Sequence, residues 1–343
     1  MVRPKKLKQG DKVAILSPSF SAPGKWPHVY ELGLSRLREG FGLEPVEFPT
    51  TKKISATREE RARDLIAAFK DKETKAVLAT FGGNDQVIYI KNLSPEPFKE
   101  NPKPFFGYSD NSHFANFLWL HGISSYYGGG IMTQFAMQKK MDAFTVEFLN
   151  HALFDEGEYE LRASESINDQ ELDWNEPTTL NQERIHEPND GWRWSGNISS
   201  EGLSWGGCLE SIDEMIRHNI TIPSLEDFEN AILMTETAEE MPSAEYVFRV
   251  YRALGERGVL ERVRGILVGR PKAWNLEKKN TPEQKKAYRE KQYETIENTV
   301  RQYNKRIPII QNLDFGHTDP QIPLPYGGKI QIDTENKKIF AEF

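Results

Sequence analysis

Strand-like and helix-like hydrophobic patterns alternate through the first 150 residues of the chain. Between the strand-like runs, helical spacing covers 30–39, and Thr57 and Glu60 form a capping-box pair at the start of a helix that extends to residue 70. The short apolar runs that predict buried strands cover residues 12–17, 46–48, 76–81 and 104–107. Such alternation with short joints is typical of a mostly parallel sheet with helices on both faces. We therefore predict an amino-terminal α/β domain over residues 1–155.

The pattern changes twice in the remainder of the chain. Residues 156–200 are rich in acidic and amide side chains and lose their periodicity, so we expect a connection or pocket loop there. Residues 201–343 regain short apolar runs around one helical pattern at 243–257; these runs cover 231–235, 265–268, 329–333 and 338–343. We expect this part to form a smaller, β-rich α+β domain.

The composition excludes several classes of protein. The 343 residues are 38% hydrophobic and carry a formal net charge of −7, whereas nucleic-acid binding usually leaves a basic footprint. Cys208 is the only cysteine, which excludes an internal disulfide and favours a reducing compartment. No apolar run approaches the length of a membrane span or of a signal-peptide core. We expect a cytoplasmic globular protein that binds neither nucleic acid nor membrane.

Ser109 is the most informative single residue. It follows the apolar run at 104–107 and precedes a helical pattern, in the segment Gly107-Tyr108-Ser109-Asp110-Asn111. A serine on a sharp strand-to-helix turn points out of the sheet, beside helix-start N–H groups that stabilise an oxyanion. The competing interpretation is an ordinary helix cap, for which serine, aspartate and asparagine are all suited.

Other small residues end the predicted strands of the same domain. They are Ser17, the pair Gly82-Gly83 and the run Gly128-Gly129-Gly130. Functional groups of parallel sheets gather at the carboxyl ends of the strands. We therefore expect these residues and Ser109 to converge on one crevice.

A serine nucleophile needs a base, and the base usually needs an acidic residue to orient it. Among the seven histidines, His317 is the strongest candidate. It lies in a loop after a predicted strand at 308–310, next to Gly316, whose conformational freedom permits a close approach. His113 lies about one helical turn after Ser109, where packing along the helix is the commoner role.

Several carboxylates are candidates for orienting that histidine. Glu236 follows the buried strand pattern at 231–235 and is the best placed. Glu239 and Glu240 come soon afterwards and are expected to face solvent, and Asp314 lies close to His317 in the chain. The order serine, acid, histidine agrees with that of α/β-hydrolases. An ordinary member of that fold is nevertheless a poor match, because the second glycine of its nucleophile elbow is missing.

These motifs, taken together, resemble the LD-carboxypeptidase family, peptidase family S66, and more closely its microcin C7 self-immunity branch. The resemblance covers nearly the whole chain and depends on six short motifs in the right order. They are Gly10-Asp11-Lys12-Val13-Ala14-Ile15-Leu16-Ser17-Pro18-Ser19, Gly82-Gly83, Gly107-Tyr108-Ser109-Asp110, Trp205-Gly206-Gly207-Cys208-Leu209-Glu210, Thr235-Glu236 and Asp314-Phe315-Gly316-His317.

The resemblance implies a role for each of the main candidates. Ser109 would be the nucleophile, His317 the general base and acid, and Glu236 the residue that orients the imidazole. Backbone N–H groups near Gly83 and Asp110 would form the oxyanion hole. The family pattern also implies an active site between an amino-terminal α/β domain and a β-rich carboxy-terminal domain, a cytoplasmic homodimer, and no metal or cofactor.

Two departures separate the chain from murein-recycling members of the family. Those members carry Arg-Gly-Gly-Tyr-Gly where residues 81–85 are Phe-Gly-Gly-Asn-Asp, and Gly-Gly-Asn-Leu where residues 206–209 are Gly-Gly-Cys-Leu. In both features the chain is similar to the immunity branch. That branch hydrolyses the bond between an aminoacyl group and a nucleotide-like sulfamoyl or phosphoramidate moiety, so the implied partner is a small aminoacyl-nucleotide or a peptide.

Further side chains are candidates for contact with the substrate. Trp192 and Trp194 would stack on a base, for about 1–3 kcal/mol, or pack at the domain junction. Arg270 would contact substrate or pair with a carboxylate. Cys208 would be a thiol nucleophile or, as is commoner for a lone cysteine, a small buried hydrophobe, which we prefer.

Two alternatives to an immunity-type hydrolase stay open at this point. The first keeps the chemistry and changes the substrate, so that the enzyme removes D-alanine from murein tetrapeptides. The second is a non-catalytic module that binds a nucleotide or sugar in the same crevice. Its glycine pairs fit that role, but they form no complete dinucleotide or phosphate-loop fingerprint.

Overall fold

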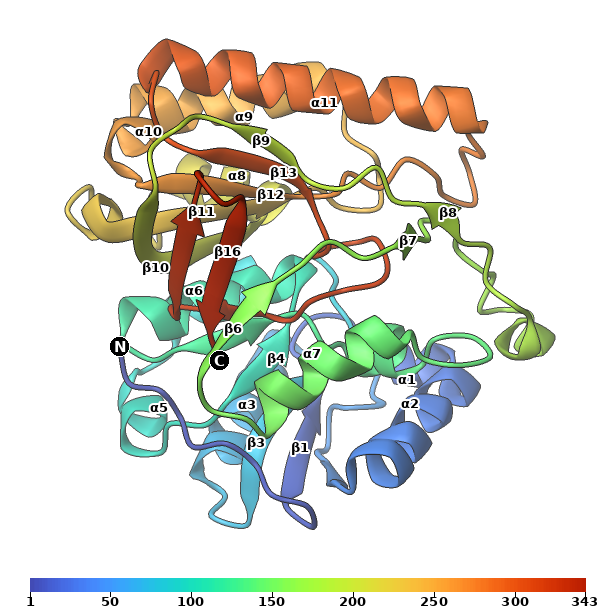
Figure 1. The fold of residues 1–343 in the computed structure, drawn as a ribbon. Helices are drawn as coiled ribbons and strands as arrows, with labels where there is room; N and C mark the ends of the chain where they lie inside the picture. Colours follow the sequence, from blue (N-terminus) through green and yellow to red (C-terminus); the bar gives the residue numbers. More distant parts are fainter.

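The computed structural model describes residues 1–343 and contains two lobes, each built around a β-sheet (Figure 1). In the first sheet, five strands run parallel and one edge strand is antiparallel. Their spatial order is β14 (Leu324–Tyr326), β5 (Ser125–Tyr127), β4 (Phe105–Gly107), β3 (Thr74–Ala79), β1 (Lys12–Leu16) and β2 (Glu44–Glu47).

The continuous apolar run of β1 explains why this sheet is covered on both faces. Val13 and Ile15 belong to a core cluster of 60 buried residues, whereas Ala14 and Leu16 belong to a separate cluster of 15. Successive side chains of a strand point to opposite faces, so each face has its own packing partners. The helices of this lobe are α1 (Ala22–Lys25), α2 (Pro27–Phe41), α3 (Arg58–Lys70), α4 (Gln86–Tyr89), α5 (Glu96–Glu100), α6 (Ser112–Leu120) and α7 (Ala143–Leu153).

The start of α3 shows how local sequence fixes an element. The side chain of Thr57 accepts a hydrogen bond from the Glu60 N–H at 3.3 Å, and the Glu60 carboxylate accepts one from the Thr57 N–H at 2.9 Å. This is the predicted capping box, which satisfies two otherwise unpaired donors at the helix start. The prediction of this helix is therefore confirmed at both ends.

The second sheet has eight strands, and four neighbouring strands in it run parallel. Helices lie between these parallel strands along the chain, and α11 covers the outer surface of the lobe beside α9 (Figure 1). The helices are α8 (Leu209–His218), α9 (Ala244–Glu256), α10 (Val259–Arg262) and α11 (Pro282–Tyr303). The strand order is β6 (Glu158–Leu161), β16 (Lys338–Glu342), β15 (Lys329–Asp333), β10 (Ser200–Cys208), β11 (Ala231–Glu236), β12 (Gly265–Gly269), β13 (Ile309–Leu313) and β9 (Arg193–Ser195).

The two lobes exchange strands, so neither is a simple continuous segment. β14 comes from the end of the chain and completes the first sheet, whereas β6 and β9 come from residues 156–200 and form the two edges of the second. The same residues also contain the small sheet of β7 (Ser166–Ile167) and β8 (Glu187–Pro188). The chain ends lie near each other, since Arg3 and Glu342 form an ion pair (Figure 1).

This architecture confirms the predicted fold class, a mostly parallel amino-terminal sheet with helices plus a β-rich carboxy-terminal part. The parallel run from β10 to β13 goes beyond the α+β prediction. None of the helices combines the length and apolar composition needed to cross a lipid bilayer.

Candidate active site

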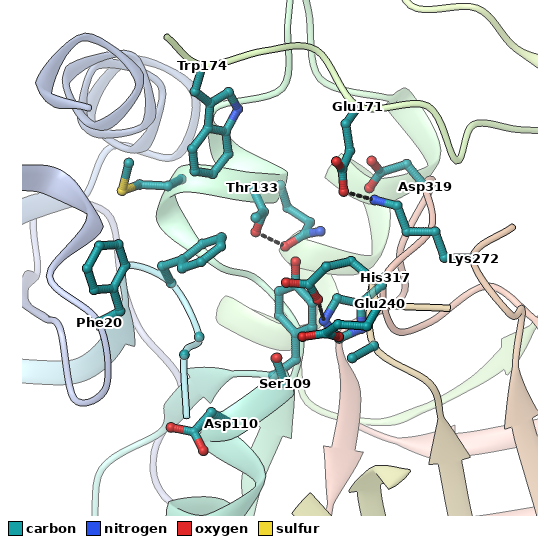
Figure 2. Close-up of a pocket in the computed structure, with 18 of the residues that line it drawn as sticks. Phe20, Ser109, Asp110, Thr133, Glu171, Trp174, Glu240, Lys272, His317 and Asp319 are labelled. Atoms are coloured by element: carbon teal, nitrogen blue, oxygen red, sulfur yellow. Dashed lines mark hydrogen bonds and ion pairs between the residues drawn. The ribbon is translucent and has the colours of Figure 1, made fainter. Parts of the chain in front are cut away.

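A cavity of about 740 Å³ contains side chains from both lobes. Figure 2 shows Ser109 at its base, His317 and Glu240 beside it, and Phe20 and Trp174 on the opposite side. The volume lies within the range of about 300–1,000 Å³ that is usual for small-molecule sites.

Ser109 lies on a strained turn between β4 and α6. Its φ of +63° is in the left-handed region, which a residue with a side chain seldom adopts. Gly82 packs directly against it: a Cβ on Gly82 would be 2.9 Å from the Ser109 Cβ and 3.0 Å from its hydroxyl oxygen. Glycine at 82 therefore leaves the space into which the serine hydroxyl projects.

The side chain of Asp110 ties this turn to the neighbouring loop. One of its oxygens accepts hydrogen bonds from the Ser19 hydroxyl at 2.5 Å and from the N–H groups of Asp85 and Gln86, both at 3.1 Å. Burial raises the pKa of Asp110, and nearby His113 partly offsets this effect. These bonds fix the loop of residues 82–86 against the serine turn.

Both residues predicted to donate to an oxyanion lie at this junction. The N–H groups of Gly83 and Asp110 donate to no acceptor in the loops and caps of the chain. Both residues line the cavity together with Ser109. Free backbone donors beside a nucleophile are what an oxyanion needs.

His317 lies against Glu236, the carboxylate at the end of β11. Its Nδ1 lies 2.7 Å from the Glu236 carboxylate, whose side chain is 0% exposed. Gly316 has a φ of +94°, and a Cβ there would collide with the same carboxylate. Because only glycine fits this approach, Gly316 allows the histidine loop to reach the end of β11.

Tyr127 connects this pair to the serine turn, and the sequence analysis did not identify it. Its hydroxyl donates to Glu236 at 2.5 Å and accepts from the Ser109 N–H at 3.1 Å. In the pairing of β4 with β5, Tyr127 is opposite Gly107. Burial and the charge of Glu236 raise the pKa of Tyr127 well above its ordinary value, so the hydroxyl keeps its proton.

The other ring nitrogen of His317 contacts a different carboxylate. Nε2 lies 3.1 Å from an oxygen of Glu239, whose side chain is 41% exposed, so Glu239 faces solvent as expected but also contacts the histidine. No hydrogen bond joins the Ser109 hydroxyl to His317 in this arrangement. Burial lowers the pKa of His317, but Glu236 and Glu239 outweigh burial and raise that pKa well above its ordinary value. Burial favours neutral Glu239, yet the contact with His317 lowers the Glu239 pKa to about 2.

The structure places three predicted substrate-binding residues away from the cavity. Arg270 is fully buried and pairs with Asp314 at 2.7 Å, which is the second of its two predicted roles. Trp192 donates its indole N–H to Asp314 at 3.1 Å, and Trp194 lies in β9 opposite Ile310. The side chains of Arg270, Trp192 and Trp194 therefore pack within the second lobe. None of the three lines the cavity. Asp314 itself is thereby engaged and does not orient His317.

Trp174 is the tryptophan of the segment 156–200 that lines the cavity, beside Trp26 of the amino-terminal lobe. Its ring meets Trp26 edge-on at 5.2 Å and Phe81 at 5.5 Å between ring centroids. It belongs to the segment 156–200 that was expected to form a connection or pocket loop. The composition of this segment indicated the loop, but its lack of periodicity gave no means of choosing among the tryptophans.

Two of the predicted strand-end groups are not part of the cavity lining. The Ser17 hydroxyl is buried and bonds to the Thr51 carbonyl and the Thr80 hydroxyl, both at 2.7 Å. Gly128 packs on the chain near Gln321, whose side chain accepts from the Gly129 N–H at 3.0 Å. Only Gly82-Gly83 and Ser109 of the expected set line the cavity.

The remaining candidates have structural partners. His113 pairs with Glu214 at 3.0 Å and with Asp110 at 3.7 Å, and the ligand atoms of these three lie within 4.8 Å of one another. Such a group could hold a metal, but no second feature of the structure indicates one. The Cys208 thiol is buried, and burial together with Glu210 raises its pKa, so it is not a thiolate nucleophile.

Two protein-family models match this chain, and together they cover most of it. Residues 13–128 match the LD-carboxypeptidase N-terminal domain, and residues 201–332 match the LD-carboxypeptidase C-terminal domain. The chain belongs to the LD-carboxypeptidase family. Ser109 lies in the amino-terminal match of this family, and Glu236 and His317 lie in the carboxy-terminal one.

Similar proteins confirm the resemblance to the microcin self-immunity branch of the LD-carboxypeptidase family. The microcin C7 self-immunity protein MccF of Escherichia coli is 25% identical over 341 residues, which are 97% of this chain and 93% of that protein. Putative carboxypeptidase YocD of Bacillus subtilis is 28% identical over 333 residues, covering 96% and 95%. The crystal structure of an MccF-like protein from Streptococcus pneumoniae in complex with AMP has a TM-score of 0.82 and 26% identity, covering 97% of this chain and 99% of that one.

Proposed function

We propose that this chain is a serine hydrolase that cleaves the amide-like bond between an aminoacyl group and a nucleotide-like sulfamoyl or phosphoramidate moiety. One observation carries the proposal. The imidazole of His317, oriented by Glu236 at 2.7 Å, lines the same cavity as the hydroxyl of Ser109 on its strained turn. A nucleophile, a base and an orienting acid with free backbone donors beside them form the arrangement used in acyl transfer.

The proposed reaction passes through an acyl-enzyme. Ser109 Oγ attacks the carbonyl carbon while its proton moves to Nε2 of His317, and the N–H groups of Gly83 and Asp110 stabilise the oxyanion. The carbon–nitrogen bond then breaks, and His317 gives the proton to the departing nitrogen. Water attacks the ester, its proton passes to His317, and the serine oxygen leaves with that proton. The products are a free amino acid and the nucleotide-like sulfamoyl or phosphoramidate compound, whose nitrogen is now an NH2 group.

The cavity suits a ligand with a planar ring at one end. Phe20, Phe81 and Trp174 contribute aromatic rings to one side of it, and Figure 2 shows Phe20 and Trp174 there. Stacking of a base on such rings is worth about 1–3 kcal/mol. The similar MccF-like protein from Streptococcus pneumoniae was solved with AMP, which supports a nucleotide-like ligand here. The cytoplasmic location and the homodimer stay predictions.

Replacement of Ser109 by alanine tests the nucleophile. We expect S109A to retain its unfolding temperature and to lose turnover of an aminoacyl-sulfamoyl adenosine, because no other group in the cavity replaces the serine oxygen. A serine-directed fluorophosphonate should label the wild-type chain at Ser109 and leave S109A unlabelled. Near-normal turnover by S109A would exclude this mechanism.

Removal of D-alanine from murein tetrapeptides is the second candidate function. The match of both halves of the chain to LD-carboxypeptidase domains favours it. The two candidates share the same nucleophile and differ only in the substrate. Turnover of the adenylate analogue and of a murein tetrapeptide, measured side by side with the same preparation, therefore decides between them.

A further inference from the structure

The nitrogen of His317 that the proposed reaction needs is occupied by a second carboxylate. Nε2 is 3.1 Å from Glu239, while Nδ1 is 2.7 Å from Glu236. An imidazole that faces carboxylates on both sides is held as imidazolium, which cannot accept a proton from Ser109. The contact with Glu239 must break before the histidine acts as a base.

The two carboxylates differ in how firmly they are held. The side chain of Glu236 is 0% exposed and is anchored by Tyr127, whereas that of Glu239 is 41% exposed. Glu239 lies on a turn after β11, where Asn275 donates to its backbone carbonyl at 3.0 Å. The carboxylate of Glu239 is therefore free to rotate away from His317 while its backbone stays in place.

The charge of the cavity shows what would draw that carboxylate away. Several further acids line the cavity, and its arginine and lysine are already paired. Arg184 bonds to Asp319 at 2.5 Å, and Lys272 bonds to Glu171 at 2.5 Å. The acids of the cavity lining without a lysine or arginine partner are Asp85, Asp110, Asp173, Glu210, Glu214, Glu239 and Glu240. This lining attracts a cation and repels an anion.

We propose that Glu239 is a positioning residue that holds His317 in a resting state, and that an ammonium group of the substrate draws it away so that Nε2 reaches Ser109. The inference rests on the proposed function, because the α-amino group of an aminoacyl substrate supplies the cation. The ion pair of Glu239 with imidazolium is exchanged for one with ammonium. The imidazolium then releases its Nε2 proton to solvent and can accept the proton of Ser109.

A fluorophosphonate without any ammonium group tests the resting contact. It cannot displace Glu239, so we expect slow labelling of the wild-type chain and labelling of Glu239→Ala about tenfold faster or more at pH 7. Glu240→Ala is the matched control, since Glu240 has the same charge on the same turn but forms no hydrogen bond or ion pair with His317. We expect that control to stay within about twofold of wild type. Equal labelling of wild type and E239A, with equal unfolding temperatures, would overturn the proposal.

A pair of substrates tests the role of the ammonium group. We expect the wild type to prefer a free aminoacyl-sulfamoyl adenosine over its N-acetyl form by about tenfold or more in kcat/KM, and E239A to lose that preference. An unchanged preference in E239A would overturn this half of the proposal. Because the labelling experiment needs no aminoacyl substrate, it still decides the resting contact if the proposed substrate is not turned over.

The pH profile of labelling gives a readout that a merely structural role would not move. Labelling needs neutral His317, and Glu239 is one of the groups that raise the His317 pKa. Without Glu239 that pKa falls, so the rise of labelling with pH shifts to lower pH in E239A, and by less in E240A, whose carboxylate does not contact His317. An unshifted profile would contradict the proposal. The groups that face this imidazole and its partner are Glu236, Glu239, Glu240, the ring of Tyr108 at 5.1 Å and, near Glu239, Lys272.

Discussion

The two ring nitrogens of His317 lie in opposite kinds of surroundings. On the Nδ1 side, Glu236 and Tyr127 form a buried network that reaches the Ser109 N–H and combines strands of both sheets. On the Nε2 side, a half-exposed glutamate on a turn makes a single contact. The fold itself therefore fixes the orientation of the His317 imidazole. In the proposal above, the access of Nε2 to Ser109 depends instead on the movement of the Glu239 side chain.

The largest loss of activity should come from removing the charge of Glu236, on the buried Nδ1 side of His317. Glu236→Gln keeps the shape but removes the charge that orients and stabilises the imidazolium, so we expect kcat to fall by about 10³-fold or more. Steady-state kinetics with an aminoacyl-sulfamoyl adenosine measure the loss, and circular dichroism checks the fold. A loss below tenfold in a folded variant would show that Glu236 does not orient the base.

A smaller loss should follow removal of the Tyr127 hydroxyl. Tyr127→Phe leaves the Ser109 N–H and one Glu236 oxygen without partners in a buried place, so we expect kcat to fall by about 10- to 100-fold. Tyr126→Phe is a matched control from the same strand, because its hydroxyl accepts from Lys6 at 2.8 Å away from the cavity. Equal kinetics in the two variants would show that the buried network does not support catalysis.

The surroundings of His317 on the Nδ1 side were largely predictable from the sequence, and those on the Nε2 side were not. Ser109, Glu236 and His317 each end or follow an apolar strand pattern; in addition, Ser109 precedes a helix start and His317 follows a glycine, and these are local signals. The sequence indicates only an ordinary strand residue at Tyr127. Tyr127 gains its role because β5 pairs with β4 in a register that places it opposite Gly107. The sequence around Glu239 predicts a solvated turn residue. Nothing near it in the chain indicates a contact with a histidine 78 positions later.

The second sheet shows the same limit at the level of the fold. The apolar run of β11 was predictable, but its neighbour β10 contains Gly202, Gly206 and Gly207, which weaken any strand pattern. The close approach of the strands explains two of them: a Cβ on Gly206 or on Gly202 would collide with the backbone of the adjacent segment. The parallel run from β10 to β13 therefore depends on packing between strands, which the hydrophobic periodicity of the sequence does not predict.

The smallest predicted effect compares two tryptophans of the segment 156–200. Trp174 lines the cavity, whereas Trp192 donates to Asp314 outside it. Trp174→Leu keeps apolar bulk but removes the ring face, so we expect KM for the nucleotide-like substrate to rise about fivefold with kcat little changed. Trp192→Leu should lower the unfolding temperature and leave KM unchanged, because it removes a partly buried hydrogen bond and no substrate contact. A rise in KM with Trp192→Leu and none with Trp174→Leu would restore the original sequence-based choice of the stacking residue. That result would also mean that the ligand binds near the second sheet, outside the cavity.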